Sequence, residues 1–178
     1  ITLLEIIPGE ETLPEVLDFM KSFCTERLSK DVIICKDTPN FIANRMGSAT
    51  NLNAMHLAFK MGMRVEEVDA LCGHAMARLR TAVFRSSDAI GLDTNFNVLR
   101  NLYANVPNDE RRDLFVYPPY VEKMVARGML GNKVGQGYYK KVIAEDGTEK
   151  ELVLDLDTLE YREKITPDFP CLRAAEKL

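Results

Sequence analysis

The sequence predicts a mainly α fold, in which a helical bundle follows an N-terminal β-α-β segment and precedes a small C-terminal β-hairpin. Short apolar runs at residues 3–7 and 32–35 flank an amphipathic stretch, the pattern of a strand, a helix and a second strand. Apolar residues at helical spacing then dominate residues 38–130. Residues 138–154 hold two short apolar segments on either side of an Asp-Gly dipeptide, which is typical of a hairpin.

The first predicted strand carries one carboxylate, Glu5, and ends at the turn signal Pro8-Gly9. The motif Thr12-Leu-Pro-Glu15 predicts a capping box and therefore the start of a helix. The apolar face of that helix consists of Val16, Leu17, Met20, Phe23 and Cys24. Two strands and one helix cannot cover both faces of a sheet. We therefore expect this segment to be the end of a larger α/β domain.

Four helices are predicted in the bundle from their periodicity and their caps. The first begins at Thr38-Pro39, because Thr is a good N-cap and Pro suits the first helical position. The third is interrupted at Gly91 and resumes with Thr94 as its cap. The fourth opens at Pro118-Pro119 and ends at Arg127-Gly128. The expected ranges are 38 to about 62, 65 to about 77, 88–103 and 118–127.

The composition excludes several classes of function. The chain of 178 residues is 46% hydrophobic and 28% charged, as in globular proteins. A net charge of -4 without a block of like charges favours neither a nucleic-acid nor a membrane partner. The four cysteines form no CxxC pair, so we expect buried, reduced thiols in a cytoplasmic protein. Because Ile1 is preceded by no initiator Met and no signal peptide is evident, we expect a fragment.

Metal and nucleophile sites are not expected. The only histidines are His56 and His74, and Cys72-Gly-His74 does not have the spacing of a zinc site. No GxSxG motif is present to supply a serine nucleophile. The glycine-rich loop 131–137 matches neither a dinucleotide fingerprint nor a Walker A loop, which favours a structural turn over a phosphate site.

Two polar residues are candidates for a site. Glu5 lies inside an apolar strand, where a carboxylate is costly unless it is hydrogen-bonded, and buried acids of this kind often orient a histidine. The alternative is an edge-strand carboxylate that points into water. Asn44 lies on an otherwise apolar helix face, where it needs a ligand or backbone groups as partners. Its alternative is a solvated Asn44-Arg45 pair, and the pattern leaves both alternatives open.

Four motifs in order resemble those of 3-hydroxyacyl-CoA dehydrogenases. Residues 3–9 resemble the strand after the catalytic histidine motif, and 36–45 resemble the segment that joins the two domains. Residues 88–94 resemble the mid-domain motif, and 128–139 resemble the closing motif with its paired aromatics. The resemblance covers roughly residues 1–141 and is specific because the motifs are long and correctly separated.

The resemblance implies oxidation of (S)-3-hydroxyacyl-CoA to 3-ketoacyl-CoA in fatty-acid β-oxidation, with NAD as hydride acceptor. It implies that NAD is bound mainly by an N-terminal Rossmann-like domain outside this chain, where a histidine acts as general base. Glu5 matches the catalytic glutamate that orients this histidine, and Asn44 matches an asparagine near the reacting part of the acyl-CoA substrate. The helical domain of the family closes over the acyl chain and usually forms a homodimer.

The implied domains are the end of the NAD-binding domain (1–37), the helical substrate-binding and dimerisation domain (38–141), and a hairpin with a linker (142–178). The tail resembles the connector of longer fatty-acid-oxidation proteins, in which an enoyl-CoA hydratase-like domain follows. The sequence departs from the family at Asn40, where Gly is common, and at residues 79–82, where Pro-Met-Gly-Pro is common. The histidine and the NAD fingerprint are absent, so we expect the fragment to be inactive. The rival hypothesis is a non-catalytic dimerisation and scaffold module.

Overall fold

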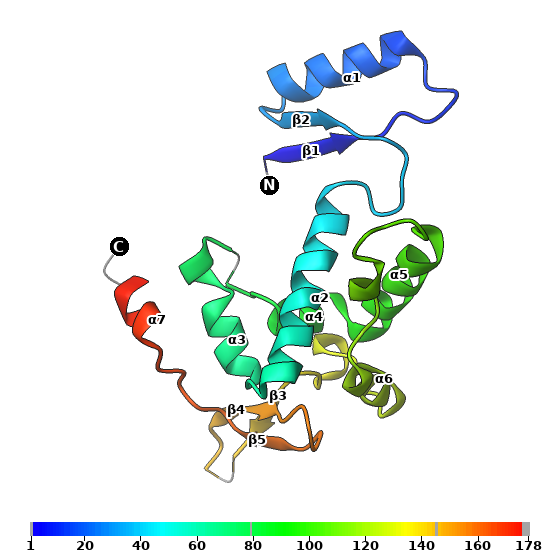
Figure 1. Ribbon diagram of the computed structural model, residues 1–178. Coiled ribbons are helices and arrows are strands. Elements are labelled where there is room, and N and C mark those ends of the chain that lie inside the picture. Colours follow the sequence, from blue (N-terminus) through cyan, green and yellow to red (C-terminus); the bar gives the residue numbers. More distant parts are fainter. Residues whose placement is uncertain (1, 79, 145, 176–178) are drawn as a thin grey trace. The chain divides into compact units, whose positions relative to one another are not determined.

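The computed structural model describes residues 2–78, 80–144 and 146–175. The chain forms two compact units, Ile1–Ser48 and Ala49–Leu178 (Figure 1). Leu79, part of the predicted departure at 79–82, lies outside the described residues, as does Glu145 of the predicted hairpin turn. Within the described ranges, no helix has both the length and the apolar character that a membrane crossing requires.

The first unit is a β-α-β segment, as predicted. Strands β1 (Leu3–Ile6) and β2 (Asp31–Ile34) pair in parallel, and helix α1 (Pro14–Glu26) connects them. The predicted capping box is wrong: the N-cap of α1 is Leu13, and no side chain caps it. Thr12 instead accepts a hydrogen bond from the backbone N–H of Gly9 at 2.9 Å, which closes the turn before the helix.

Several apolar side chains of this first unit have no cover in the described part of the chain. Phe19 on α1 is 65% exposed, and Ile33 and Ile34 on β2 are also exposed. Parallel sheets are normally buried on both faces, because helices pack on each side. The two-stranded sheet of this unit therefore leaves apolar side chains exposed.

The second unit is a set of helices around one apolar core. After the start of α2 (Ala43–Met61) come α3 (Val65–Leu71), α4 (Phe84–Ile90), α5 (Leu92–Asn105) and α6 (Pro119–Ala126). Short 3-10 turns lie at His74–Met76, Arg112–Phe115 and Asn132–Val134. The core includes fully buried residues from many of these elements: Val65, Phe84, Leu92, Leu102, Val121, Met124 and Tyr138. The predicted mainly α fold is thereby confirmed.

Some predicted helix bounds are wrong for identifiable reasons. The first bundle helix begins at Ala43 rather than Thr38, because Asn40 (φ 62°) and Phe41 (φ 50°) adopt left-handed backbone conformations that a right-handed helix cannot contain. The predicted break at Gly91 is confirmed, with φ at 99°. However, α5 resumes at once with Leu92, so Thr94 lies inside the helix and does not cap it.

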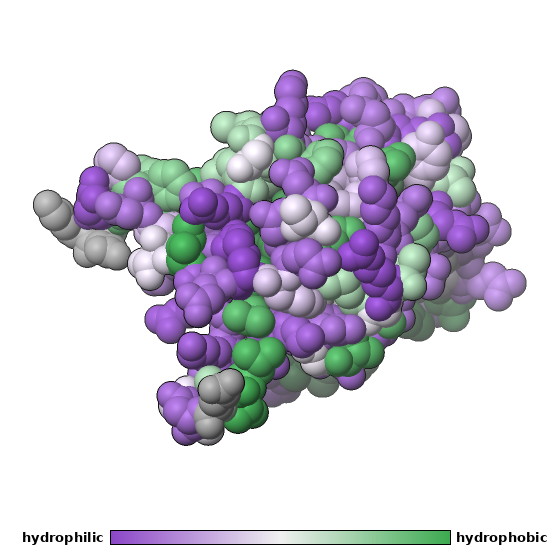
Figure 2. Space-filling model, turned by 90° about the horizontal axis from the view of Figure 1, so that it is seen from below, coloured by the Kyte–Doolittle hydropathy of each residue, from purple (hydrophilic) through white to green (hydrophobic). Residues whose placement is uncertain are grey.

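A small antiparallel sheet follows the helices. Strands β3 (Tyr139–Ile143) and β4 (Glu149–Leu154) form the predicted hairpin, and β5 (Tyr161–Glu163) adds a third strand beside β4. The sequence analysis missed β5 because it is short and polar. Helix α7 (Pro170–Ala175) lies near the end of the chain. Figure 2 views the molecule from below, and polar side chains cover most of this face, with apolar patches between them.

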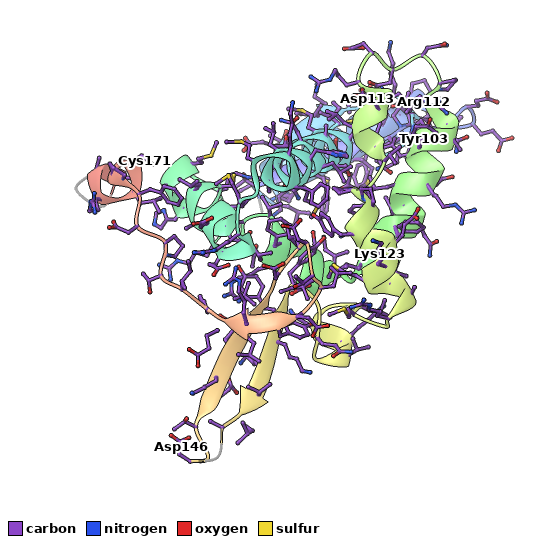
Figure 3. The ribbon with its side chains drawn as sticks, turned by 60° about the horizontal axis from the view of Figure 1, so that its bottom comes forward. Tyr103, Arg112, Asp113, Lys123, Asp146 and Cys171 are labelled. Carbon is purple, nitrogen blue, oxygen red and sulfur yellow. The ribbon has the colours of Figure 1, made fainter. Side chains whose placement is uncertain are left out.

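The cysteines follow the prediction only in part. All four are free thiols, and Cys24 and Cys35 are buried as expected. Cys72 is half-buried, and Cys171 is exposed on α7 (Figure 3). The expectation of four buried thiols is therefore wrong for Cys171, because α7 lies on the surface.

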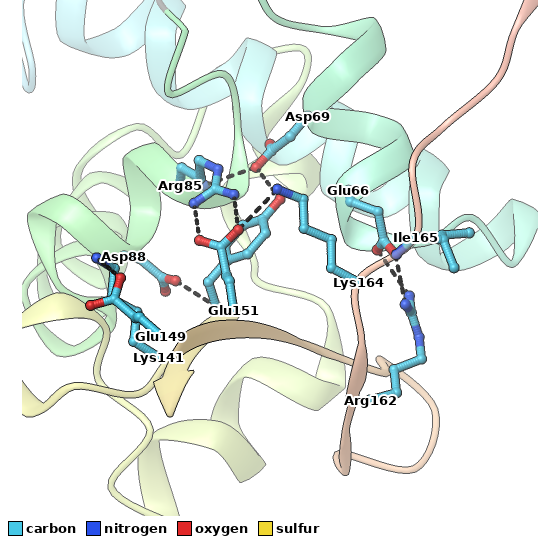
Figure 4. Close-up of polar contacts among 11 residues, drawn as sticks. Glu66, Asp69, Arg85, Asp88, Lys141, Glu149, Glu151, Arg162, Lys164 and Ile165 are labelled. Carbon is cyan, nitrogen blue, oxygen red and sulfur yellow. Dashed lines mark hydrogen bonds and ion pairs between the residues drawn. The ribbon is translucent and has the colours of Figure 1, made fainter. Parts of the chain in front are cut away.

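Ion pairs join the three-stranded sheet to the helices (Figure 4). Arg85 of α4 donates to both carboxylate oxygens of Glu151 on β4, each at 2.7 Å. Arg162 of β5 pairs in the same bidentate way with Glu66 of α3, at 2.6 and 2.9 Å. Bidentate pairs of this kind are geometrically specific as well as strong. They therefore fix the register of the sheet against the helices.

The two later sequence motifs meet at the buried carboxylate of Asp88. Its two oxygens accept the backbone N–H groups of Tyr138 and Tyr139, each at 2.9 Å. Gly131 and Gly137 lie so close to Asp88 that a Cβ atom on either would collide with it. Gly131 and Gly137 thus permit a close approach of the loop to Asp88, which is a structural role.

We expect Gly137→Ala to unfold the protein at a markedly lower denaturant concentration. Its Cβ would overlap the Asp88 carboxylate, and overpacking of this kind costs about 2–4 kcal/mol. Gly47→Ala is the matched control, because a Cβ there meets nothing within 4 Å. Since Gly47 lies inside α2, that change should stabilise by about 0.5–1 kcal/mol. Equal unfolding midpoints for Gly137→Ala and the unmodified protein would contradict the packing argument.

A second prediction concerns the pH dependence of stability. Hydrogen bonds from Arg85, followed by that from Lys164, lower the pKa of Glu151 to about 2 against desolvation, which acts to raise it. A carboxyl with a depressed folded-state pKa contributes stability that is present above its unfolded pKa, near 4.5, and is lost as pH falls toward 2. We expect Glu151→Gln to lower the free energy of unfolding at neutral pH by about 1–2 kcal/mol.

The same substitution should also reduce the loss of thermal stability as the pH falls below about 4.5. Glu149→Gln is the control, because Glu149 pairs with Lys141 at 2.6 Å on the exposed face of the same hairpin. Solvent screens an exposed pair, so its contribution to stability should be small. Equal losses of unfolding free energy in the two variants would show that the contact with Arg85 stabilises no more than an exposed ion pair.

Candidate functional site

The carboxylate of Glu5 lies at the start of helix α2. Its Oε1 accepts the backbone N–H groups of Ile42 and Ala43, each at 2.9 Å. The first N–H groups of a helix have no partner within the helix, and the helix dipole favours a negative charge there. Glu5 therefore caps a helix that follows it by more than thirty residues, and it is not the free edge-strand carboxylate of the alternative hypothesis.

The ionisation of Glu5 follows from these contacts. The N–H of Ala43, with those of Ile42 and the thiol of Cys35, lowers the pKa of Glu5 below its ordinary value. Partial desolvation acts in the opposite direction but does not prevail. Glu5 is thus a carboxylate at neutral pH. None of these hydrogen bonds reaches its second oxygen, Oε2.

Asn44 follows Ala43 directly and is the second residue of α2. Its side chain is exposed, so the amide is accessible to a ligand. The structure therefore places the two predicted site residues at one helix terminus: Glu5 holds the N–H groups of residues 42 and 43, and Asn44 lies in the turn that they begin. Both belong to the compact unit Ile1–Ser48.

The loop before α2 aims its N–H groups at Glu5. Cys35 continues the ladder of the sheet by donating its N–H to the carbonyl of Ile6 at 2.8 Å. The chain then turns through Asn40 and Phe41, both with positive φ. Asn tolerates the left-handed region better than most residues with a side chain. Asn40 therefore suits the left-handed conformation that this turn requires.

Cys35 is a residue of the site that the sequence analysis missed. Its buried Sγ lies 3.5 Å from Oε1 of Glu5 and donates a hydrogen bond to it. Burial, with the nearby Glu5 carboxylate, raises the pKa of this thiol, so it stays protonated. The signal that could have found it is the strand register, because Glu5 pairs with Ile33, two residues before Cys35.

The second unit contains a cavity with a polar border and a cavity with an apolar border. One of about 450 Å³ is bordered by Arg85, Asp88, Tyr139, Lys141 and Glu151, whose charges are paired with one another or with neighbouring groups. The other, of about 280 Å³, lies between α2 and α3 and is mainly apolar. Its border includes Leu57, Met61, Met63, Leu71 and Met76.

Histidines take no part in a metal centre in the described chain. His56 makes a 2.8 Å hydrogen bond with the carbonyl oxygen of Val116, and His74 lies in a 3-10 turn. Among the described residues, no group of three or more His, Cys, Asp or Glu side chains is arranged to hold a metal ion. The candidate site therefore consists of Glu5, Cys35 and Asn44.

Known proteins share this sequence and fold. The chain is 41% identical over 177 residues to a "Probable 3-hydroxyacyl-CoA dehydrogenase" of Bacillus subtilis, covering 98% of this chain and 21% of that protein. It is 28% identical over 160 residues to a Rickettsia felis protein named as a fatty acid oxidation complex trifunctional enzyme, covering 89% and 22%. The crystal structure of (S)-3-hydroxybutyryl-CoA dehydrogenase from Ralstonia eutropha matches with a TM-score of 0.64 and 25% identity, over 77% of this chain and 46% of that one.

The chain spans about a fifth of the length of these two relatives. The sequence profile of the 3-hydroxyacyl-CoA dehydrogenase C-terminal domain matches residues 41–141, which is more than half of the chain. That match covers the helical bundle, the mid-domain motif that begins at Asp88 and the closing motif 128–139. This chain therefore belongs to the 3-hydroxyacyl-CoA dehydrogenase family and contains the C-terminal domain of that family.

Proposed function

We propose that the protein containing this chain is an NAD-dependent dehydrogenase that oxidises (S)-3-hydroxyacyl-CoA to 3-ketoacyl-CoA in fatty-acid β-oxidation. The observation that carries the proposal is the ionised Glu5 at the N-terminus of α2, with Oε2 outside its capping hydrogen bonds and Asn44 in the adjoining turn. The names of the relatives support the same chemistry.

Glu5 acts in this proposal by orienting a histidine from chain outside residues 1–178. An imidazole N–H donated to Oε2 would fix the tautomer, which leaves the other ring nitrogen free to take the proton of the substrate hydroxyl. The negative charge of Glu5 also stabilises the imidazolium that forms. A capped carboxylate suits this task because its position is fixed before substrate binds.

NAD supplies the hydride acceptor when it is bound. The parallel β1–α1–β2 segment with its exposed apolar faces fits the edge of a dinucleotide-binding domain. Its turn between β1 and α1, residues 7–13, has no GxGxxG fingerprint. We therefore assign NAD binding mainly to the preceding chain, and we expect residues 1–178 alone to be inactive.

We assign residues 1–37 to the NAD-binding domain, 38–141 to substrate binding and dimerisation, and 142–178 to a hairpin and a linker. The exposed amide of Asn44 binds the reacting part of the acyl-CoA in this proposal. The helical domain closes over the acyl chain and forms a homodimer. An adjoining enoyl-CoA hydratase-like domain is proposed from the trifunctional relative.

One observation favours a different function, a dimerisation and scaffold module without catalysis. The apolar cavity between α2 and α3 is flanked by Met61 and Met76, which are 67% and 61% exposed. Flexible methionine side chains suit an interface with another protein surface as well as an acyl chain. The two functions differ in what they require of Glu5 and Asn44.

Glu5→Gln in the full-length protein should lower kcat by about 100-fold and leave KM for the acyl-CoA nearly unchanged. Gln retains an oxygen that can accept the N–H groups of Ile42 and Ala43, so the fold should be kept, but the charge that orients the histidine is lost. NADH formation followed by absorbance gives kcat and KM. An unchanged kcat would refute the catalytic assignment.

Asn44→Ala in the full-length protein distinguishes the dehydrogenase hypothesis from the scaffold hypothesis. We expect kcat/KM to fall by about 10- to 100-fold through loss of a hydrogen bond to substrate, with the oligomeric state unchanged. The control is Asn97→Ala, which removes an exposed asparagine of α5 remote in sequence from the α2 terminus. Equal activity of both variants would favour the scaffold, and light scattering would record any loss of dimer.

A further inference from the structure

The thiol of Cys35 has two possible acceptors. Its Sγ lies 3.5 Å from Oε1 of Glu5 and 3.9 Å from the carbonyl oxygen of Ile33. The nearer acceptor is a carboxylate, and hydrogen bonds to charged acceptors are the stronger ones. The thiol proton is therefore directed at Glu5.

The strand register produces this contact. The parallel pairing of β1 and β2 places Glu5 beside Ile33. Side chains two residues apart along a strand lie on the same face, so Cys35 follows Ile33 on the face of Glu5. The backbone N–H of Cys35 also donates to Ile6 at 2.8 Å, which extends the ladder and fixes the residue.

Three donors therefore converge on one oxygen of Glu5. Two are backbone N–H groups from the start of α2, and the third is a side chain from the end of β2. The χ3 angle of a glutamate has a broad energy minimum. Two neighbouring donors from one helix end therefore leave the carboxylate some freedom to rotate about that bond. A donor from a second element narrows that freedom and so fixes the direction of Oε2.

We propose that Cys35 is a positioning residue of the dehydrogenase: its thiol holds Oε1 of Glu5 so that Oε2 faces the histidine. This inference rests on the function proposed above, because Cys35 acts only through Glu5. No part of the reaction requires the thiol to ionise or to be oxidised. The side chain acts solely as a hydrogen-bond donor.

Three variants of the full-length enzyme test the assignment. Cys35→Ala removes the donor and should lower kcat by about 3- to 10-fold without changing KM. Cys35→Ser restores a donor and should recover kcat to within about twofold of the original. Cys24→Ala is the matched control, because Cys24 is a buried thiol of the same unit, 2% exposed against 3% for Cys35. It should affect thermal stability and leave kcat unchanged.

A double-mutant cycle distinguishes this inference from the proposed function. In the Glu5→Gln background, Cys35→Ala should cause no further loss of kcat. If Glu5→Gln lowers kcat but Cys35→Ala does not, the positioning role is wrong and the proposed function stands. If Glu5→Gln has no effect, both are wrong. If Cys24→Ala lowers kcat as much as Cys35→Ala, loss of packing explains the effect and the positioning role is again wrong.

An infrared measurement gives a readout that needs no turnover. The difference spectrum between the unmodified protein and Cys35→Ala isolates the S–H stretching band of Cys35. A hydrogen bond to a carboxylate lowers its frequency, so the band should move to higher frequency in Glu5→Gln, where the acceptor is uncharged. A band that does not respond to Glu5→Gln would overturn the proposed contact.

Discussion

The hydrogen bonds from Ile42 and Ala43 to Glu5 are the interaction on which the candidate site depends. They satisfy N–H groups that the start of a 19-residue helix leaves without partners, and they do so with a charge that the helix dipole favours. A carboxylate has two oxygens, and this cap uses only Oε1. The side chain therefore holds the helix with one oxygen, and in the proposed function it orients a catalytic base with the other. In that function, different oxygens of one residue serve the structure and the chemistry.

Carboxylates that accept backbone N–H groups recur in the second unit. Asp69 receives the N–H groups of Val83, Phe84 and Arg85 at the start of α4. Asp88 receives those of Tyr138 and Tyr139 at the start of β3. Burial raises the pKa of Asp88 to about 6, and the two N–H donors oppose that rise. Each acid joins two separate segments, and Asp88 joins the mid-domain motif to the closing motif.

The sequence predicts the need for a partner at Glu5 but not the partner itself. A charge inside an apolar strand requires a hydrogen bond, whichever fold surrounds it. The donors here are backbone groups whose direction depends on the positive φ of Asn40 and Phe41, and no side-chain pattern encodes them. The same two residues explain why the start of α2 was placed too early. Cys35 was missed because its relation to Glu5 exists only through the register of two strands. The short β5 was missed because it is attached to the helices by the ion pair between Arg162 and Glu66, which are far apart in sequence.

The cap at the start of α2 also confines the candidate site to one compact unit. Glu5, Cys35 and Asn44 all lie within the compact unit Ile1–Ser48, and hydrogen bonds within that unit set the direction of Oε1. The donors to Oε1 belong to Cys35, Ile42 and Ala43, so none of them comes from the unit Ala49–Leu178. The candidate site therefore keeps its geometry through contacts within one unit, independently of residues farther along the bundle. In the function proposed above, one arrangement for proton transfer would thus serve acyl chains that bind the helical domain in different ways.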